Sequence, residues 1–213
     1  MASVDWLAAR SPTGSCAVKR CSRLQAPGAT PLTVRTRQSV TVAALLASPP
    51  TTSGARTTAK VQQAATLLGG GRLLVVNLFA FPVADLPALA VCGSGAAGWL
   101  AARPKLAAAL QEADCLLAAW GLHRLHGKAR LLQEQQMSWM EEEARAYGHL
   151  SAWCVGGQPR HPSRWHQYVS DRHGRTTGGS SSDRLGQVLG ESPLRGLVRR
   201  ARVTAGRPDA SAS

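Results

Sequence analysis

Aromatic residues are scarce in this chain, at 5% of 213 residues, and paired cysteines are absent. A core must therefore be built mainly from Ala, Leu and Val. The cysteines are Cys16, Cys21, Cys92, Cys115 and Cys154, and no two have the two-residue spacing of a zinc knuckle or a redox motif. An odd, scattered set favours a reducing compartment over a disulfide framework. The sequence predicts no metal site.

Long apolar runs are also lacking. None approaches the roughly 18 residues that span a membrane, and the run at 40–47 begins too deep in the chain for a signal peptide. We therefore expect no membrane partner and a cytoplasmic protein. The alternative is an organellar protein, because the acid-poor, Arg/Ser/Thr-rich residues 1–38 have the composition of a transit peptide.

Motifs for common cofactors are missing as well. The segment 53–58 precedes a predicted helix but lacks the Gly-Lys-Thr ending of a nucleotide-binding loop. The three glycines at 69–71 precede a predicted strand, whereas the dinucleotide fingerprint follows one. His123 and His126 have a spacing that suits a metal, but no third ligand is evident. No cofactor is predicted.

Acidic residues are few, and their distribution is uneven. The chain has 25 Lys and Arg against 12 Asp and Glu, a net charge of +13. Residues 1–84 hold nine basic residues and one acid, residues 158–213 hold ten and four, and the middle is nearly neutral. The positive electrostatic field of such a chain attracts polyanions, including nucleic acid. Solvated tails of an Arg-rich protein would give the same pattern.

The chain divides into three parts by composition. Residues 1–38 mix Ser, Pro, Gly, Thr and Arg without apolar periodicity, which predicts a disordered or poorly packed arm. Residues 39–170 hold the periodic apolar segments and are predicted to form the folded domain. Residues 171–213 are predicted to be a basic, partly disordered tail, with one short amphipathic helix over 185–202.

Strand-like and helix-like segments alternate within that domain. This order predicts a three-layer α/β sandwich of about four mainly parallel strands flanked by helices. In such sheets, ligands bind beyond the carboxyl ends of the strands. The predicted strands are 41–47, 73–79, 115–119 and 150–154, and the predicted helices are 57–68, 104–112 (opened by Pro104) and 128–147.

Four short segments follow or flank these strands. They read Thr-Thr-Ala-Lys-Val at 57–61, Val-Val-Asn-Leu-Phe-Ala at 75–80, Ala-Ala-Trp-Gly at 118–121 and Gly-Gln-Pro-Arg-His-Pro at 157–162. In this order and spacing, residues 41–163 resemble the bacterial family known as domain of unknown function 1643. That family has no assigned activity, so the resemblance implies the fold class rather than a function.

The loop after the first strand departs from that family. The family usually has Asn-Pro-Ser-Thr-Ala there, followed by an acidic stretch, whereas this chain has Ser-Pro-Pro-Thr-Thr at 48–52. Ser48 stands in place of the Asn, and Ala55 or Arg56 stands at the acidic position.

The same segments are more distantly similar to the uracil-DNA glycosylase superfamily. The resemblance implies a water-positioning loop at 48–52, a base-reading Asn77, and a His161 that stabilises negative charge on the departing base. An amide suits the base-reading role because it both donates and accepts hydrogen bonds. The implied catalytic residues are His161 and Ser48, and the implied ligand-binding residues are Asn77, Phe79, Trp120, Arg160, Thr51 and Thr52.

The segment after His161 mixes aromatic and cationic side chains, as single-strand binders do. Predicted nucleic-acid contacts are Arg164, Trp165, Arg199, Arg200 and Arg202. Alternatively, the aromatic residues here anchor the tail onto the domain.

These residues lead to one leading hypothesis and two alternatives. The leading hypothesis is a nucleobase- or nucleic-acid-binding protein, glycosylase-like, with a degenerate water-positioning loop. The first alternative is a non-enzymatic accessory domain with a vestigial pocket, in which Asn77 only fixes a turn and Trp120 only fills the core. The second is a small-molecule hydrolase using the same pocket. The residues fit both an enzyme and a binding protein.

Overall fold

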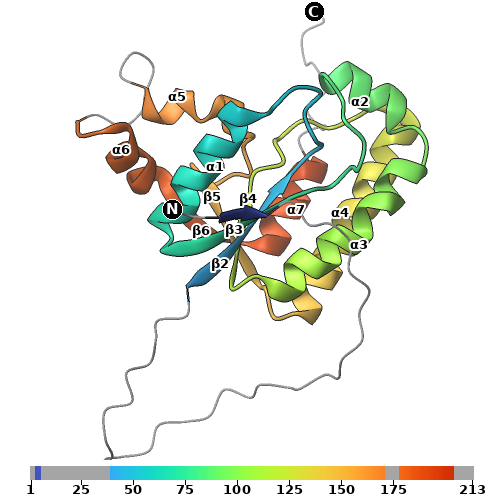
Figure 1. Cartoon of the computed structure of the whole chain (residues 1–213). Coiled ribbons are helices and arrows are strands. Elements are labelled where there is room, and N and C mark those ends of the chain that lie inside the picture. Colours follow the sequence, from blue (N-terminus) through green and yellow to red (C-terminus); the bar gives the residue numbers. More distant parts are fainter. Residues whose placement is uncertain (1–2, 6–38, 171–177, 204–213) are drawn as a thin grey trace, which may run out of the picture. The chain divides into compact units, whose positions relative to one another are not determined.

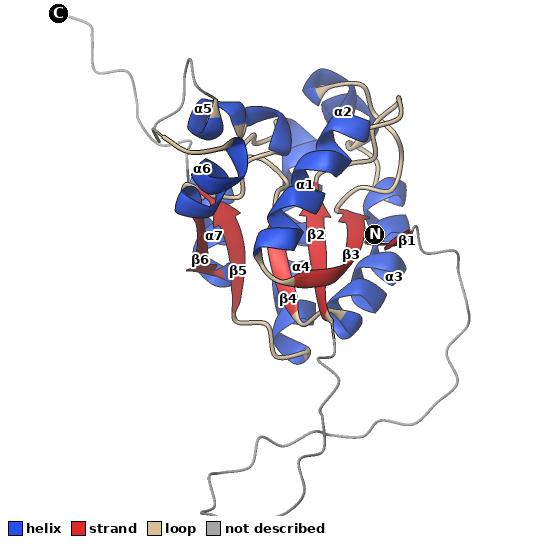
Figure 2. Cartoon of the chain, turned by 60° about the vertical axis from the view of Figure 1, so that its left-hand side comes forward, coloured by secondary structure: helices blue, strands red, loops and turns tan. Residues whose placement is uncertain are grey.

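The structure, a computed structural model, describes residues 3–5, 39–170 and 178–203. These residues form a six-stranded sheet in the order β1-β3-β2-β4-β5-β6 (Figures 1 and 2). All neighbours are parallel except β5 and β6. The predicted α/β fold with a mainly parallel sheet is confirmed. The strands are β1 Ser3–Asp5, β2 Val40–Leu46, β3 Gly70–Asn77, β4 Cys115–Ala118, β5 Ser151–Val155 and β6 Leu189–Pro193.

The four predicted strands are β2, β3, β4 and β5, which are neighbours in the sheet. Residues 42–46 of β2 and 73–76 of β3 are buried, as expected for strands with helices on both faces. Leu46 pairs with Asn77, and Leu45 pairs with Ala118. The carboxyl ends of β2, β3 and β4 therefore lie level at one edge of the sheet.

Helices cover both faces of the sheet. Figure 1 shows α1, α5 and α6 on one side of the sheet, and α3, α4 and α7 on the other. The helices are α1 Ala55–Leu67, α2 Leu86–Cys92, α3 Ala97–Glu112, α4 Gly127–Ala146, α5 His166–Val169, α6 Ser181–Val188 and α7 Leu194–Val203, with a 3-10 turn η1 at Pro162–Arg164. None of the helices in the described ranges has the length and apolar character to cross a bilayer.

The prediction that Pro104 opens a helix is wrong. Helix α3 begins at Ala97 and contains Pro104 in its interior. A proline there loses one backbone hydrogen bond and costs about 3 kcal/mol. Trp99 and Ala102, in the turns before it, are each 3% exposed. Their burial offsets that cost, and Pro104 itself lies on the exposed side of the helix.

The two ends of the chain differ from the prediction where the structure describes them. Ser3–Asp5, which the sequence places in an unpacked arm, pair with β3. The rest of that arm, at 6–38, lies outside the described residues. At the other end, residues 181–203 form α6, β6 and α7 rather than one helix in a tail.

The folded domain therefore continues beyond residue 170. Strand β6 pairs with β5 along its whole length, and a capping box of Ser180 and Asp183 fixes the start of α6. Leu185, Leu194 and Leu197 are each at most 2% exposed. These leucines complete the core, which explains why a segment with so much Arg and Ser still folds.

Leu197→Ala tests this correction. Removing a side chain that is 1% exposed should lower the free energy of unfolding by about 2–5 kcal/mol, because a cavity remains. The measurement is urea unfolding followed by circular dichroism. Leu131→Ala, the same change at a helical position 56% exposed, is the control and should cost under about 0.5 kcal/mol. Equal small effects would show that α7 is not part of the core.

Candidate ligand-binding cleft

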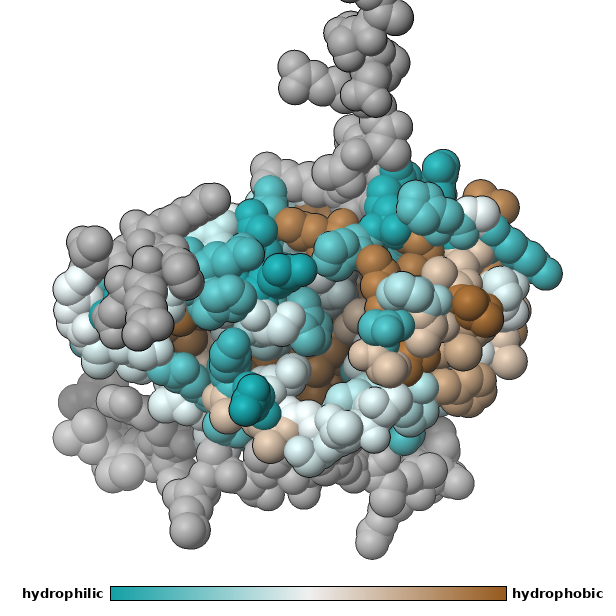
Figure 3. Space-filling view, turned by 90° about the horizontal axis from the view of Figure 1, so that it is seen from above, coloured by the Kyte–Doolittle hydropathy of each residue, from teal (hydrophilic) through white to brown (hydrophobic). Residues whose placement is uncertain are grey.

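A cleft of about 440 Å³ opens at the carboxyl end of the sheet. Figure 3 views the molecule from above, where hydrophilic and hydrophobic surfaces adjoin. Four segments form the walls: the loop after β2, the loop before α2, the Trp120-Gly121 turn after β4, and η1 with the residue preceding it. The lining residues are Leu46 to Pro50, Thr57, Val83 to Leu86, Leu89, Trp120, Gly121, His123, Gln133, His161, Ser163 and Arg164.

Part of the cleft lining is apolar. The apolar residues include Leu46, Pro49, Val83, Leu89 and Trp120. Trp120 is 6% exposed, and its indole N–H has no hydrogen-bond partner among the described residues. An unpaired buried donor costs about 1–3 kcal/mol. A ligand acceptor that reached this N–H would remove that cost.

The lining also includes His161, which has a fixed tautomer. Its Nδ1 accepts the backbone N–H of Ser163 at 3.2 Å and lies 2.9 Å from the Ser163 hydroxyl oxygen. Since Nδ1 is an acceptor, the neutral ring carries its hydrogen on Nε2. Burial lowers the pKa of His161, and the charges of Lys60 and His123 lower it further. At pH 7 the imidazole is therefore a neutral N–H donor.

Two cations flank His161. Lys60 on α1 donates from Nζ to the Pro162 carbonyl oxygen at 2.9 Å, which ties α1 to the η1 turn. Burial, and then Arg56, lower the pKa of Lys60. Arg164 is exposed and lines the cleft. The surroundings of His161 are therefore rich in donors and positive charge.

A glycine brings two of the walls together. Gly121 has φ +92°, a left-handed conformation that favours glycine. Its N–H donates to the Pro159 carbonyl oxygen at 2.6 Å. A Cβ on Gly121 would lie 3.6 Å from Cβ of His161. The turn after β4 therefore packs directly against the segment that holds His161.

The structure brings some of the predicted site residues together. Ser48, Trp120 and His161 line the cleft, as does Arg164, which we predicted to contact nucleic acid. Arg160 lines an adjoining hollow of about 150 Å³ that shares His161 and Arg164 with the cleft. Its guanidinium lies 5.2 Å from the centre of the Tyr168 ring. Thr51 and Thr52 are exposed in the same loop as Ser48 but do not line the cleft.

Asn77 and Phe79 are not brought to the cleft. Asn77 ends β3 opposite Leu46, and its side-chain oxygen is buried without a hydrogen-bond partner among the described residues. Phe79 is 0% exposed and packs edge-on against Trp99, with ring centres 5.0 Å apart. A Cβ on Gly98 would lie 2.2 Å from its ring. The ligand role predicted for Phe79 is therefore wrong, because the residue is in the core.

Trp165 is a second correction. Its side chain is 1% exposed, and its indole N–H donates to the Arg160 carbonyl oxygen at 2.8 Å. A ring buried in this way cannot stack on a base, so the alternative prediction, an anchor within the domain, holds. Arg199, Arg200 and Arg202 lie in the last turns of α7. Their side chains are outside the described part of the structure, so their contact with nucleic acid stays a prediction.

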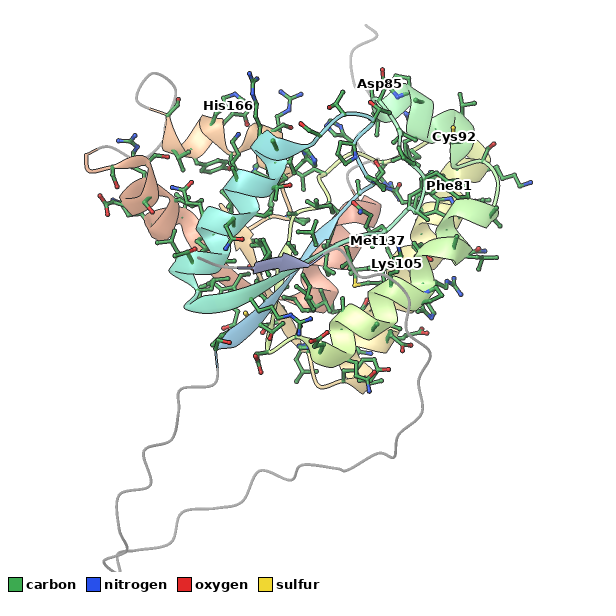
Figure 4. All side chains as sticks on the ribbon, viewed as in Figure 1. Phe81, Asp85, Cys92, Lys105, Met137 and His166 are labelled. Atoms are coloured by element: carbon green, nitrogen blue, oxygen red, sulfur yellow. The ribbon has the colours of Figure 1, made fainter. Side chains whose placement is uncertain are left out.

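Sequence reasoning missed two polar residues of the cleft, Asp85 and Gln133. Asp85 begins α2 and is labelled in Figure 4. It is the only charged residue between Leu73 and Ala102, and this isolation is a signal that could have found it. Gln133 accepts the Leu125 N–H at 3.1 Å and donates to the His123 carbonyl oxygen at 3.3 Å, which braces the loop after β4. No pattern distinguishes Gln133 from other helical glutamines.

His123 lines the cleft, but His126 does not. In the ranges that the structure describes, no three His, Cys, Asp or Glu side chains are placed to hold a metal ion.

Comparison with protein families gives one match. Residues 36–163 match the family described as protein of unknown function (DUF1643). The chain belongs to this family. No curated protein and no solved structure matches significantly. The family description names no activity, so a function must be argued from the cleft, and the likeness to uracil-DNA glycosylases stays a prediction.

Lys60→Met tests the electrostatics of the cleft. Removing this charge should raise the pKa of His161 toward its ordinary value of about 6.5, though not fully, because burial is the larger cause of the lowered pKa. The measurement is an NMR titration of the His161 ring. Lys60→Arg keeps the charge and should leave the pKa unchanged, as should Lys105→Met on the exposed side of α3. No shift in Lys60→Met would contradict the assigned coupling.

Proposed function

We propose that the cleft binds a nucleotide unit, either free or within single-stranded nucleic acid. Its volume of about 440 Å³ lies in the range of pockets that hold small organic ligands, about 300–1,000 Å³. Its position beyond the carboxyl ends of β2 and β4 is where open parallel sheets bind ligands.

One observation supports this proposal above the others: the cleft lining combines two kinds of chemistry. Its apolar residues offer surface against which a flat base can pack. Its donors are the fixed N–H of His161 and the guanidinium of Arg164. Arginine and N–H groups are the usual partners of phosphate oxygens. A ligand with an aromatic part and an anionic part suits both kinds of lining residue.

The charge of the whole protein supports the same ligand class. The net charge is +13, and the long-range field of such a protein raises the local concentration of phosphate-bearing ligands. Arg160 adds a further cation in the adjoining hollow. A strand of nucleic acid could therefore contact Arg160 and Arg164 while one nucleotide entered the cleft.

A second candidate is hydrolysis of the bond between base and sugar. The neutral His161 favours it, because an N–H donor stabilises the negative charge that develops on a departing base. Asn77 does not line the cleft, so we no longer propose it as the base reader. An accessory domain would bind without turnover, and a small-molecule hydrolase would accept other substrates. A screen of uracil, mismatch and deaminated-base oligonucleotides separates these alternatives.

Arg164→Ala tests the proposed binding. Fluorescence anisotropy with a labelled single-stranded oligonucleotide should show affinity that falls with salt, because bound phosphates release counterions. Loss of one phosphate contact should reduce the slope of log affinity against log salt by about 0.7. The control is Lys105→Ala, an exposed cation on α3 away from the cleft, which should leave the slope unchanged. Salt-independent binding, or no binding at low salt, would reject the nucleic-acid ligand.

A further inference from the structure

The charged and imidazole groups of the cleft come from two segments of the chain. His161 and Arg164 supply hydrogen-bond donors to the lining. Asp85 is the only acidic residue among all the residues that line the cleft. It belongs to the loop before α2, whereas the donors belong to η1 and the residue before it. A ligand in the cleft can therefore meet the donors of one segment and the carboxylate of another.

The local structure holds this carboxylate in place. Oδ1 of Asp85 accepts the backbone N–H of Ala88 at 2.9 Å, which caps α2. The second oxygen of Asp85 has no partner in the described parts of the chain, and the residue is exposed at the cleft. One oxygen is thus used to fix the side chain, and the other is left to accept a hydrogen bond.

We propose that Asp85 is the specificity-determining residue of the cleft and selects nucleotides that present a hydrogen-bond donor to it, a base amine or a sugar hydroxyl. This inference rests on the proposed nucleotide binding and adds a selection rule to it. A carboxylate oxygen accepts hydrogen bonds and cannot donate them. A ligand amine or hydroxyl satisfies it, whereas a ligand carbonyl placed there leaves two acceptors facing each other.

The cap makes two informative variants available. Asp, Asn and Ser all cap helices well, so Asp85→Asn and Asp85→Ser should keep the melting temperature. In Asp85→Asn, Oδ1 keeps the cap and an NH₂ group replaces the free oxygen, which reverses the hydrogen-bonding polarity at that point. In Asp85→Ser, the hydroxyl caps the helix and nothing remains at the position of the free oxygen.

The experiment measures the binding of UMP, dUMP and dCMP by calorimetry. Comparing dCMP with dUMP tests a base amine, and comparing UMP with dUMP tests a sugar hydroxyl. The wild-type protein should prefer the donor-bearing member of one pair by roughly tenfold, the scale of one charge-assisted hydrogen bond. Asp85→Ser should remove that preference. If the donor is the amine, Asp85→Asn should reverse it in favour of dUMP, whose carbonyl accepts from the new NH₂.

Ratios of affinity, rather than affinities, are the readout, because losing a negative charge strengthens the binding of every phosphate. Asp114→Asn is the matched control. Its carboxylate also accepts one backbone N–H, that of Thr41 at 2.7 Å. Asp114 precedes β4 and so lies at the amino ends of the strands, whereas the cleft lies at their carboxyl ends. This variant should leave every ratio unchanged.

The outcomes separate this inference from the proposed function. If no nucleotide binds the wild-type protein, both the proposed function and the role of Asp85 are rejected. If nucleotides bind without preference in both pairs, or if Asp85→Ser keeps the preference, the role of Asp85 is rejected while nucleotide binding stands.

Discussion

The pairing of β2 with both β3 and β4 is the constraint on which the rest of the structure depends. Residues 42–46 of β2 are buried, so the strand has to lie inside the sheet with a helix layer on each face. Its register sets Leu46 beside Asn77 and Leu45 beside Ala118. Three strands therefore end at one level, and the loops that follow β2 and β4 meet there as two walls of the cleft.

Each wall of the cleft contributes a different kind of side chain. The loop after β2 and the loop before α2 provide apolar surface and one carboxylate, and the turn after β4 provides the Trp120 ring. The η1 region provides the histidine and the cation. The Lys60 bond to the Pro162 carbonyl oxygen joins α1 to that region. The Lys60 hydrogen bond thus fixes the η1 wall against α1. The register of β2 with β3 and β4 fixes the positions of the loops that follow β2 and β4.

The strands and site residues that could be predicted are those whose sequence pattern depends on local structure. Strands buried on both faces are near-continuous apolar runs, so all four central strands were visible, and their ends predicted that Ser48, Trp120 and His161 would gather. Phe79 and Trp165 were misassigned because an aromatic residue beside a polar motif looks the same whether it packs inward or outward. Strand β6 was missed because an edge strand with polar residues has weak periodicity. Asp85 was missed because its importance comes from the position of α2, which only tertiary packing sets.

The antiparallel pairing of β5 with β6 affects when, during synthesis, the backbone hydrogen-bonding groups at the edge of β5 become paired. Strands β2 to β5 lie within residues 40–155 and can pair as soon as they leave the ribosome. The outer edge of β5 has to wait for residues 189–193. Until then the edge of β5 presents unpaired backbone N–H and C=O groups. Such groups can pair with a strand of another chain and cause aggregation. The segment between β5 and β6, residues 156–188, carries five Arg against two Asp, and repulsion between like-charged neighbouring nascent chains opposes their association.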